Sequence, residues 1–314
     1  MLQFILLDYG VVYFSVRFTV LRGFTMTAVF ALATSLLWGL ADFGGGLLTR
    51  RFQALTVVVV SQTLAAVVLG AIVVATGGWR EAGPQLWFAV GAGVVGPAAM
   101  LCFYRALALG PMGVVSPLAA LGTVLVPLGV GIVAGERPGL LQGAGMVVAV
   151  VGVLLAGGPK IGGASIARQT IVLTLVSALG FGAVMALISE ASTTLTGLFL
   201  ALFVQRVCNV AVGGAALYAA VRRGTPALPE GGFAALKGSL PMLAFVGIAD
   251  VAANGTYSLA AQHGPVTMAA VLASLYPVVT TLAALGVLKE RMRAIQTAGA
   301  SLALVGTVLL ASGG

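Results

Sequence analysis

Long apolar runs, separated by short polar breaks, make up most of the chain. Breaks marked by Gly, Pro and charged residues predict ten apolar segments, each long enough for a bilayer core of about 30 Å. They fall at residues 28–48, 55–76, 86–109, 113–134, 140–157, 169–190, 196–220, 240–262, 265–288 and 294–312. The runs are continuous rather than alternating, which favours helices over barrel strands. The pattern therefore predicts an all-α, polytopic membrane protein with ten transmembrane helices.

Composition and charge agree with this prediction. Of the 314 residues, 60% are hydrophobic and only 8% are charged, against about 25% charged residues in a soluble domain. The net charge is +8, but the Lys and Arg residues are scattered at segment ends, as topology signals are, and form no phosphate-binding face. The expected partners are the lipid bilayer and a small-molecule substrate, with no nucleic acid. The oligomeric state is left open.

The sequence predicts neither a metal site nor a cofactor. Cys102 and Cys208 stand alone in separate segments, a spacing that indicates neither a disulfide framework nor metal ligands. The phosphate-binding pattern G-x-x-x-x-G-K-[ST] does not occur, so transport would draw on an ion gradient or on the substrate's own gradient. If protons are coupled, the candidate carriers are Asp42, Glu190, Asp250 and His263.

The chain divides into two similar halves. Residues 27–157 and 169–312 form the predicted five-helix repeats, and residues 158–168 form the linker. Residues 1–26 are predicted to be an N-terminal extension, either a start-site artefact or a loose amphipathic segment, because Asp8 and Arg17 interrupt them and no signal-peptide cleavage pattern follows.

The repeat is visible residue by residue. From Gly110 and from Gly264 onward the two halves align without gaps, at a separation of 154 residues, and earlier positions match at a separation of 143. The shared positions include Gly110/Gly264, Pro111/Pro265, Glu136/Glu290, Arg137/Arg291, Gln142/Gln296, Gly145/Gly299 and Gly152/Gly306, and before them Trp38-Gly39/Phe181-Gly182, Gln62/Gln205 and Gly70/Gly213. Five is odd, so the second repeat would enter the membrane from the opposite side. Such inverted repeats place a substrate site between the halves near the midplane and permit alternating access.

The doubled motifs resemble a known family. Trp38-Gly39 in the first segment, Tyr-x-Ala-Leu-x-x-Gly-Pro from Tyr104, Gly-Glu-Arg before the fifth segment and a glycine-rich fifth segment resemble the EamA family of the drug/metabolite transporter superfamily, over about residues 27–312. The resemblance implies ten helices around a central cavity and export or exchange of small metabolites, such as amino acids, or of drugs. The second half departs from the pattern with Phe181-Gly182 and Lys289-Glu290, which puts the symmetry of the cavity in question.

Polar residues at mid-membrane depth are the candidate site. A charge there costs about 2.5–3.5 kcal/mol, so it should face the bundle interior or a wet cavity. Asp42 and Trp38 lie one turn apart on one helix face. Each residue is interpreted as functional or as structural. The structural alternative is an ion pair or a hydrogen-bonded helix contact for Asp42 and simple packing for Trp38.

In the seventh and eighth segments Arg206 and Asp250 lie at similar depth, and we predict an intramembrane pair. The pair is either structural or binds a charged end of the substrate. Asp250→Asn should lose transport more than folding. The full candidate set for substrate binding or ion coupling is Trp38, Asp42, Gln62, Tyr104, Gln205, Arg206, Asp250, Asn254 and Tyr257.

Other motif residues are predicted to be structural. Glu136, Arg137, Glu290 and Arg291 lie at segment ends, where they would fix the turns into the fifth and tenth segments. Gly145 and Gly152, like Gly299 and Gly306, recur at seven residues and would form small-residue stripes for close helix packing. Arg105 can snorkel to the interface, and His263 lies at a turn.

The sequence allows more than one function and two membrane orientations. The leading prediction is an exporter of small metabolites or drugs in the plasma or inner membrane. Import or exchange of sugars or nucleotide precursors is the alternative, and an intramembrane enzyme is a rival without an assembled set of catalytic groups. If the first segment starts in the cytoplasm, ten Lys and Arg lie on the opposite side. The positive-inside rule therefore favours both termini of the ten-segment core outside, whereas the resemblance implies both inside.

Overall fold

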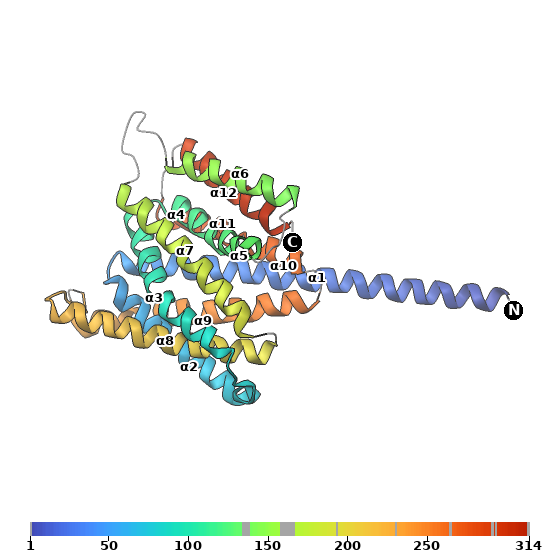
Figure 1. The fold of residues 1–314 in the computed structure, drawn as a ribbon, viewed down its shortest axis with the longest axis horizontal. Coiled ribbons are helices and arrows are strands. Elements are labelled where there is room, and N and C mark those ends of the chain that lie inside the picture. Colours follow the sequence, from blue (N-terminus) through green and yellow to red (C-terminus); the bar gives the residue numbers. More distant parts are fainter. Residues whose placement is uncertain are drawn as a thin grey trace.

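The computed structural model describes the backbone of residues 2–133, 139–157, 167–192, 194–229, 231–263, 266–289, 292 and 294–312, and most side chains from Thr25 onward. Every regular element in these ranges is a helix, which confirms the all-α prediction (Figure 1). The helices are α1 (Leu2–Thr49), α2 (Ala54–Thr76), η1 (Gly78–Glu81), α3 (Leu86–Leu109), α4 (Met112–Ala120), α5 (Gly122–Val133), α6 (Leu140–Gly157), α7 (Arg168–Ala191), α8 (Leu195–Arg222), α9 (Gly232–His263), α10 (Val266–Ala273), α11 (Tyr276–Val287) and α12 (Ala294–Ser312).

Many of these helices are suited to a bilayer. Among the described residues, seven stretches are long and apolar enough to cross a membrane: Thr25–Thr49, Ala54–Thr76, Leu86–Leu109, Arg168–Ala191, Leu195–Arg222, Gly232–His263 and Ala269–Val287. Gly143–Gly152 and Ala294–Leu309 are shorter apolar helices. The chain is thus a multi-pass membrane protein. The helix that was expected at 240–262 begins earlier, at Gly232.

Two of the expected helices are each divided in two. The segment predicted at 113–134 forms α4 and α5, and the one predicted at 265–288 forms α10 and α11. Pro277 stands at the start of α11 and has no N–H for the carbonyl of Ala273, where α10 ends. In the first half, Gly122 opens α5 where α7 crosses it, since a Cβ on Gly122 would lie 1.8 Å from the carbonyl oxygen of Ala178. The two breaks occupy equivalent places in the two halves.

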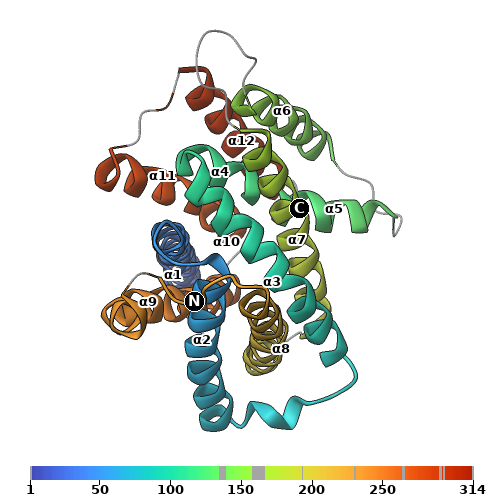
Figure 2. The same cartoon turned by 90° about the vertical axis from the view of Figure 1, so that its left-hand side faces the viewer.

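Helices of one half pack on helices of the other in exchanged pairs. The helix α3 packs along α7, and α9 packs along α1. Likewise α5 contacts α7, and α11 contacts α1. The equivalent helices α2 and α8 contact each other, as do α6 and α12 (Figure 1). In the view of Figure 2, α1 is seen end-on among α2, α3, α9 and α11, all of which it contacts. The helix α1 thus contacts helices of both halves.

Glycines fix the direction of these pairs. A Cβ on Gly152 would lie 2.3 Å from the amide nitrogen of Ala303, and one on Gly306 would lie 2.6 Å from the amide nitrogen of Ala149. Residue numbers therefore rise along α6 as they fall along α12, so the two helices run antiparallel. This contact confirms the predicted close packing at Gly152 and Gly306.

Gly39 follows Trp38 and Gly182 follows Phe181 at equivalent places in the repeat, and the two glycines have the same structural role. A Cβ on Gly39 would lie 2.6 Å from the carbonyl oxygen of Tyr276, and one on Gly182 would lie 2.2 Å from that of Gly122. Tyr276 follows Gly122 by 154 residues, the offset of the repeat. Each first helix therefore crosses the broken helix of the other half at its break, and only a residue without a Cβ fits there.

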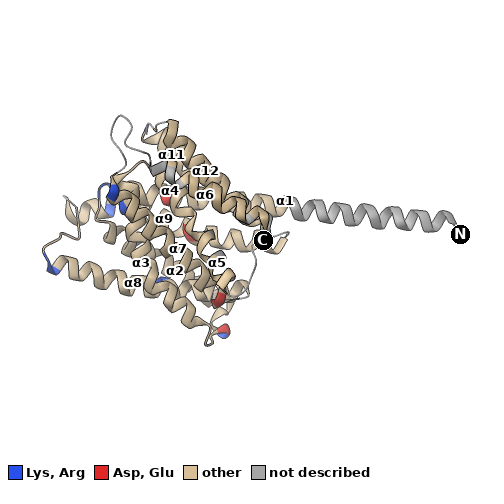
Figure 3. Cartoon of the chain, turned by 45° about the horizontal axis from the view of Figure 1, so that its top comes forward, with Lys and Arg blue, Asp and Glu red and all other residues tan. Residues whose placement is uncertain are grey.

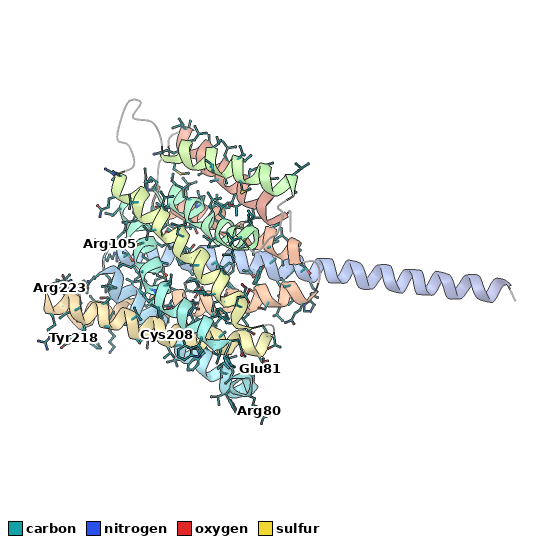
Figure 4. The ribbon with its side chains drawn as sticks, in the orientation of Figure 1. Arg80, Glu81, Arg105, Cys208, Tyr218 and Arg223 are labelled. Carbon is teal, nitrogen blue, oxygen red and sulfur yellow. The ribbon has the colours of Figure 1, made fainter. Side chains whose placement is uncertain are left out.

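Charged residues lie mainly at the ends of the helices (Figure 3). Figure 4 shows Arg105 and Arg223 at one end of the bundle, and Arg80 and Glu81 toward the other. The few charges within the bundle are therefore the exceptions that need a function or a partner.

Candidate functional site: a cavity between the two halves

A cavity lies where the halves meet. Its volume is about 170 Å³, whereas a single water needs about 10–15 Å³. Residues of α1, α2, α3 and α5 line it from the first half, and residues of α7, α8, α9 and α11 from the second. The structure brings eight of the nine predicted site residues to this cavity: Trp38, Asp42, Gln62, Tyr104, Gln205, Arg206, Asp250 and Asn254.

An ion pair forms on one side of the cavity. The guanidinium of Arg206 on α8 donates through Nη2 to Oδ2 of Asp250 on α9. The indole Nε1 of Trp38 on α1 donates to the other carboxylate oxygen, Oδ1, at 3.2 Å. The side chain of Arg206 is 8% exposed and that of Asp250 is 25% exposed. Both carboxylate oxygens of Asp250 therefore accept hydrogen bonds, and the charge of Asp250 neutralises that of Arg206.

An amide pair adjoins the ion pair. Asn209 on α8 donates from Nδ2 to Oε1 of Gln62 on α2, at 3.1 Å. A Cβ on Gly96 of α3 would lie 2.5 Å from Oδ1 of Asn209, so this glycine makes room for the asparagine. Oε1 of Gln205, Nε of Arg206 and Oδ1 of Asn209 are buried and have no hydrogen-bond partner among the described residues. Such atoms cost about 1–3 kcal/mol each, a cost that is typical of functional sites.

Asp42 on α1 lines the same cavity in a different setting. It is partly exposed, and no side chain or backbone group in the described ranges donates a hydrogen bond to its carboxylate. The glycines that follow it let other helices come close, since a Cβ on Gly45 would lie 2.5 Å from ring carbons of Tyr104. Tyr104 is buried and also lines the cavity. Unlike Asp250, the carboxylate of Asp42 is therefore available to a ligand.

Aromatic rings surround Trp38. Its ring centroid lies 5.9 Å from that of Tyr276, in an edge-on arrangement, and 6.2 Å from that of Tyr257. Tyr276 lines the cavity, whereas Tyr257, the ninth predicted residue, supports Trp38 from behind and is not among the lining residues. Sequence reasoning missed Tyr276, although Pro277 beside it already indicated an irregular helix.

Apolar residues of α3 and α7 line the opposite side. Phe103 and Phe181 pack edge-on, with ring centroids 5.3 Å apart, and Met100 and Met185 lie on the same wall. These residues were missed because aromatic and methionine side chains in an apolar helix look like ordinary packing. A signal was present in the repeat, since Phe181 and Met185 occupy the positions of Trp38 and Asp42.

Several other singled-out residues lie away from the cavity. Arg105 and Glu190 are exposed, and His263 is an exposed residue at the end of α9 whose Nδ1 lies 2.7 Å from the carbonyl oxygen of Leu259. The predicted motif residues Glu136, Arg137, Glu290 and Arg291 lie outside the described residues.

A carboxylate outside the bundle connects the two halves at one end. Glu81 of η1 accepts hydrogen bonds from the hydroxyls of Thr194 and Thr196, and Thr194 caps α8 by accepting from the amide of Gly197 at 3.0 Å. The hydrogen bonds from Thr194 and then Thr196 lower the pKa of Glu81 below its ordinary value. This clamp joins the loop after α2 to the beginning of α8.

Comparison with known proteins agrees with this architecture. No curated protein matches the chain. A protein of known crystal structure is similar in fold, with a TM-score of 0.57 and 18% identity over 91% of this chain and 96% of that chain. The sequence profile described as the EamA-like transporter family matches residues 25–158 and again residues 168–312. Since the two matches span most of the sequence, the chain belongs to the EamA-like transporter family.

Proposed function

We propose that the protein is a secondary carrier that moves small molecules across the membrane by alternating access. In this proposal α4 with α5, and α10 with α11, each count as one crossing, which gives ten crossings in two inverted repeats of five. The antiparallel contact of α6 with α12 supports the inversion, because equivalent helices of inverted repeats must run in opposite directions. The exchanged pairs α3 with α7 and α9 with α1 support it as well.

The observation that carries the proposal is the cavity between the halves. Its lining combines a carboxylate, Asp42, with the Arg206–Asp250 pair, and both halves contribute to it. Ionisable groups inside a membrane protein are costly, and they characteristically mark substrate or ion pathways. A site lined by helices of both halves can change its access when some of these helices move against the others.

We further propose that the carrier exports metabolites or drugs from the cell across the plasma or inner membrane. Coupling would come from an ion gradient or from the substrate gradient. If protons are coupled, Asp42 and Asp250 are the carriers best supported, because they line the cavity, while Glu190 and His263 are exposed at helix ends.

Everted membrane vesicles test function and direction together. Vesicles containing the protein should accumulate a labelled compound from a panel of amino acids, amines, sugars and nucleotide precursors, and vesicles with Asp250→Asn should accumulate less at equal expression. Glu190→Gln, which removes an exposed acid outside the cavity, is the matched control. Uptake into right-side-out vesicles alone would show import instead, and chemical conversion of a substrate in detergent would show an enzyme. Normal transport by well-expressed Asp250→Asn would contradict the role given to the pair.

A further inference from the structure

The charges of the cavity do not balance. Among the described lining residues, the charged groups are Asp42, Arg206 and Asp250. Arg206 is bound to Asp250, and Trp38 satisfies the remaining oxygen of Asp250. Asp42 receives no hydrogen bond from any described group. With all three groups ionised the cavity carries one net negative charge, which a single positive charge on a ligand would neutralise.

The charged and amide side chains of the described lining lie on other helices than its methionines and phenylalanines. The polar wall consists of α1, α2, α8 and α9, which carry Asp42, Gln62, Arg206 and Asp250. The apolar wall consists of α3 and α7, with Met100, Phe103, Phe181 and Met185, and the phenol of Tyr104 is the one polar side-chain group that these two helices add to the described lining. A ligand that fills this space must therefore be charged at one end and apolar at the other.

The repeat explains how the two walls came to differ. Trp38 and Asp42 on α1 correspond to Phe181 and Met185 on α7, at the offset of 143 residues. Asp250 and Asn254 on α9 follow Gly96 and Met100 on α3 by 154 residues, and all four line the cavity. The positions of Trp38, Asp42, Asp250 and Asn254 thus carry an apolar side chain or a glycine in the other half, whereas Gln62 and Gln205 are polar in both halves. A fold requirement would be expected in both halves, so the polar set distinguishes the ligand.

Aromatic rings near Asp42 suit a cation. The rings of Trp38 and Tyr276 line the cavity and pack edge-on against each other, and the face of an aromatic ring attracts a positive charge by about 0.5–2 kcal/mol. A zwitterionic amino acid would add a carboxylate beside two others, whereas the one cation in the described lining is already paired with Asp250.

We infer that the cavity takes an aryl-alkyl amine as a monocation, with its ammonium group at Asp42 and its ring against the apolar wall of α3 and α7. The inference rests on the proposed function, because it names the substrate class for the same cavity. It predicts that the cavity binds such amines in preference to the corresponding amino acids, which carry an additional carboxylate.

Three matched probes test the inference by binding to the purified full-length protein in detergent. They are 2-phenylethylamine, phenylalanine, which adds a carboxylate, and 2-phenylethanol, which removes the charge. Calorimetry should show the amine binding at least about tenfold tighter than the other two, since a factor of ten corresponds to about 1.4 kcal/mol. Asp42→Asn should weaken amine binding about tenfold or more and leave the alcohol unchanged, whereas Glu190→Gln should change neither affinity.

Unaltered gel-filtration and melting profiles for Asp42→Asn establish that the variant is folded, and Asp42→Glu should recover part of the amine affinity. Phenylalanine binding as tightly as the amine, or Asp42→Asn binding the amine like the wild type, would overturn the inference. Transport is measured separately in proteoliposomes. If phenylalanine is transported but the amine does not bind, the carrier function stands and the inference about amines is wrong. If the amine binds in an Asp42-dependent way but no bound probe is transported, the binding site stands and the proposed carrier function is wrong.

Discussion

Removing one member of the Arg206–Asp250 pair should destabilise the protein far more than removing both. Asp250→Ala leaves the guanidinium of Arg206, a side chain only 8% exposed, without its carboxylate. An uncompensated buried charge costs about 3–5 kcal/mol, whereas replacing a whole buried pair by apolar residues is often neutral or stabilising. The double variant Arg206→Met/Asp250→Leu leaves no orphaned charge but takes the acceptor from the indole of Trp38, so it should lose only about 1–3 kcal/mol.

The variant Trp38→Phe measures the contribution of the hydrogen bond from Trp38 to Asp250. It removes only the indole donor to Oδ1 of Asp250, and a hydrogen bond to a charged group contributes about 1.5–3 kcal/mol. Asp250→Asn retains one amide oxygen for one of the two donors, so its loss should fall between those of Trp38→Phe and Asp250→Ala.

Equilibrium unfolding in mixed detergent and dodecyl sulfate micelles, followed by circular dichroism, gives the free energies for all four variants. The additional single variants Arg206→Met and Asp250→Leu complete a double-mutant cycle with the double variant, which isolates the coupling between Arg206 and Asp250. A double variant as unstable as Asp250→Ala would refute the reasoning, because the loss would then come from packing and not from an orphaned charge.

Three further predictions concern contacts around the cavity and at its end. Gly96→Val should displace Asn209 and weaken ligand binding, because even a Cβ would lie 2.5 Å from Oδ1 of Asn209; calorimetry with any bound probe checks this, and unchanged affinity contradicts it. Gly152→Leu should separate α6 from α12 and cost about 1–3 kcal/mol by overpacking, whereas Gly129→Leu, where a Cβ meets nothing within 4 Å, should cost less in the same unfolding assay. The pKa of Glu81 is lowered in the folded protein, so the stabilisation by its hydrogen bonds is present above the ordinary pKa of 4.5 and is lost as the pH falls through the folded-state value. The difference in melting temperature between wild type and Glu81→Gln should therefore shrink on acidification from about pH 7 to about pH 3. A difference that is constant with pH would contradict the clamp.

The sequence predicted the class of fold well because the bilayer leaves few choices. Backbone groups in a membrane must be satisfied within a segment, so long apolar runs become helices. The breaks inside 113–134 and 265–288 were less visible, because Pro117, Pro127 and Pro277 all lie in these segments and a proline can kink a helix or end it. Which of these occurs depends on the helix that crosses at that point, and the crossing glycines Gly39 and Gly182 lie far away in sequence.

The polar side of the cavity was predictable for a different reason. Polar residues at mid-membrane depth are costly, so Asp42, Arg206 and Asp250 stood out from an apolar background. The apolar wall gave no such contrast, since Met100 and Phe103 have the same character whether they face lipid, another helix or a ligand. The sequence predicted only some of the polar contacts in the cavity. The similar depth of Arg206 and Asp250 indicated that they pair, but nothing indicated that Trp38 would donate to the other carboxylate oxygen of Asp250.

The distribution of hydrogen bonds indicates which helices separate most easily. Those that line the cavity connect α1 with α9, α8 with α9, and α8 with α2. Within the described residues, none connects these four helices with α3 or α7 across the cavity. Apolar contacts are non-directional and can slide, whereas an opened polar contact leaves buried groups unpaired. Movement of α3 and α7 past the polar wall would therefore change access to Asp42 while the Arg206–Asp250 pair stays intact.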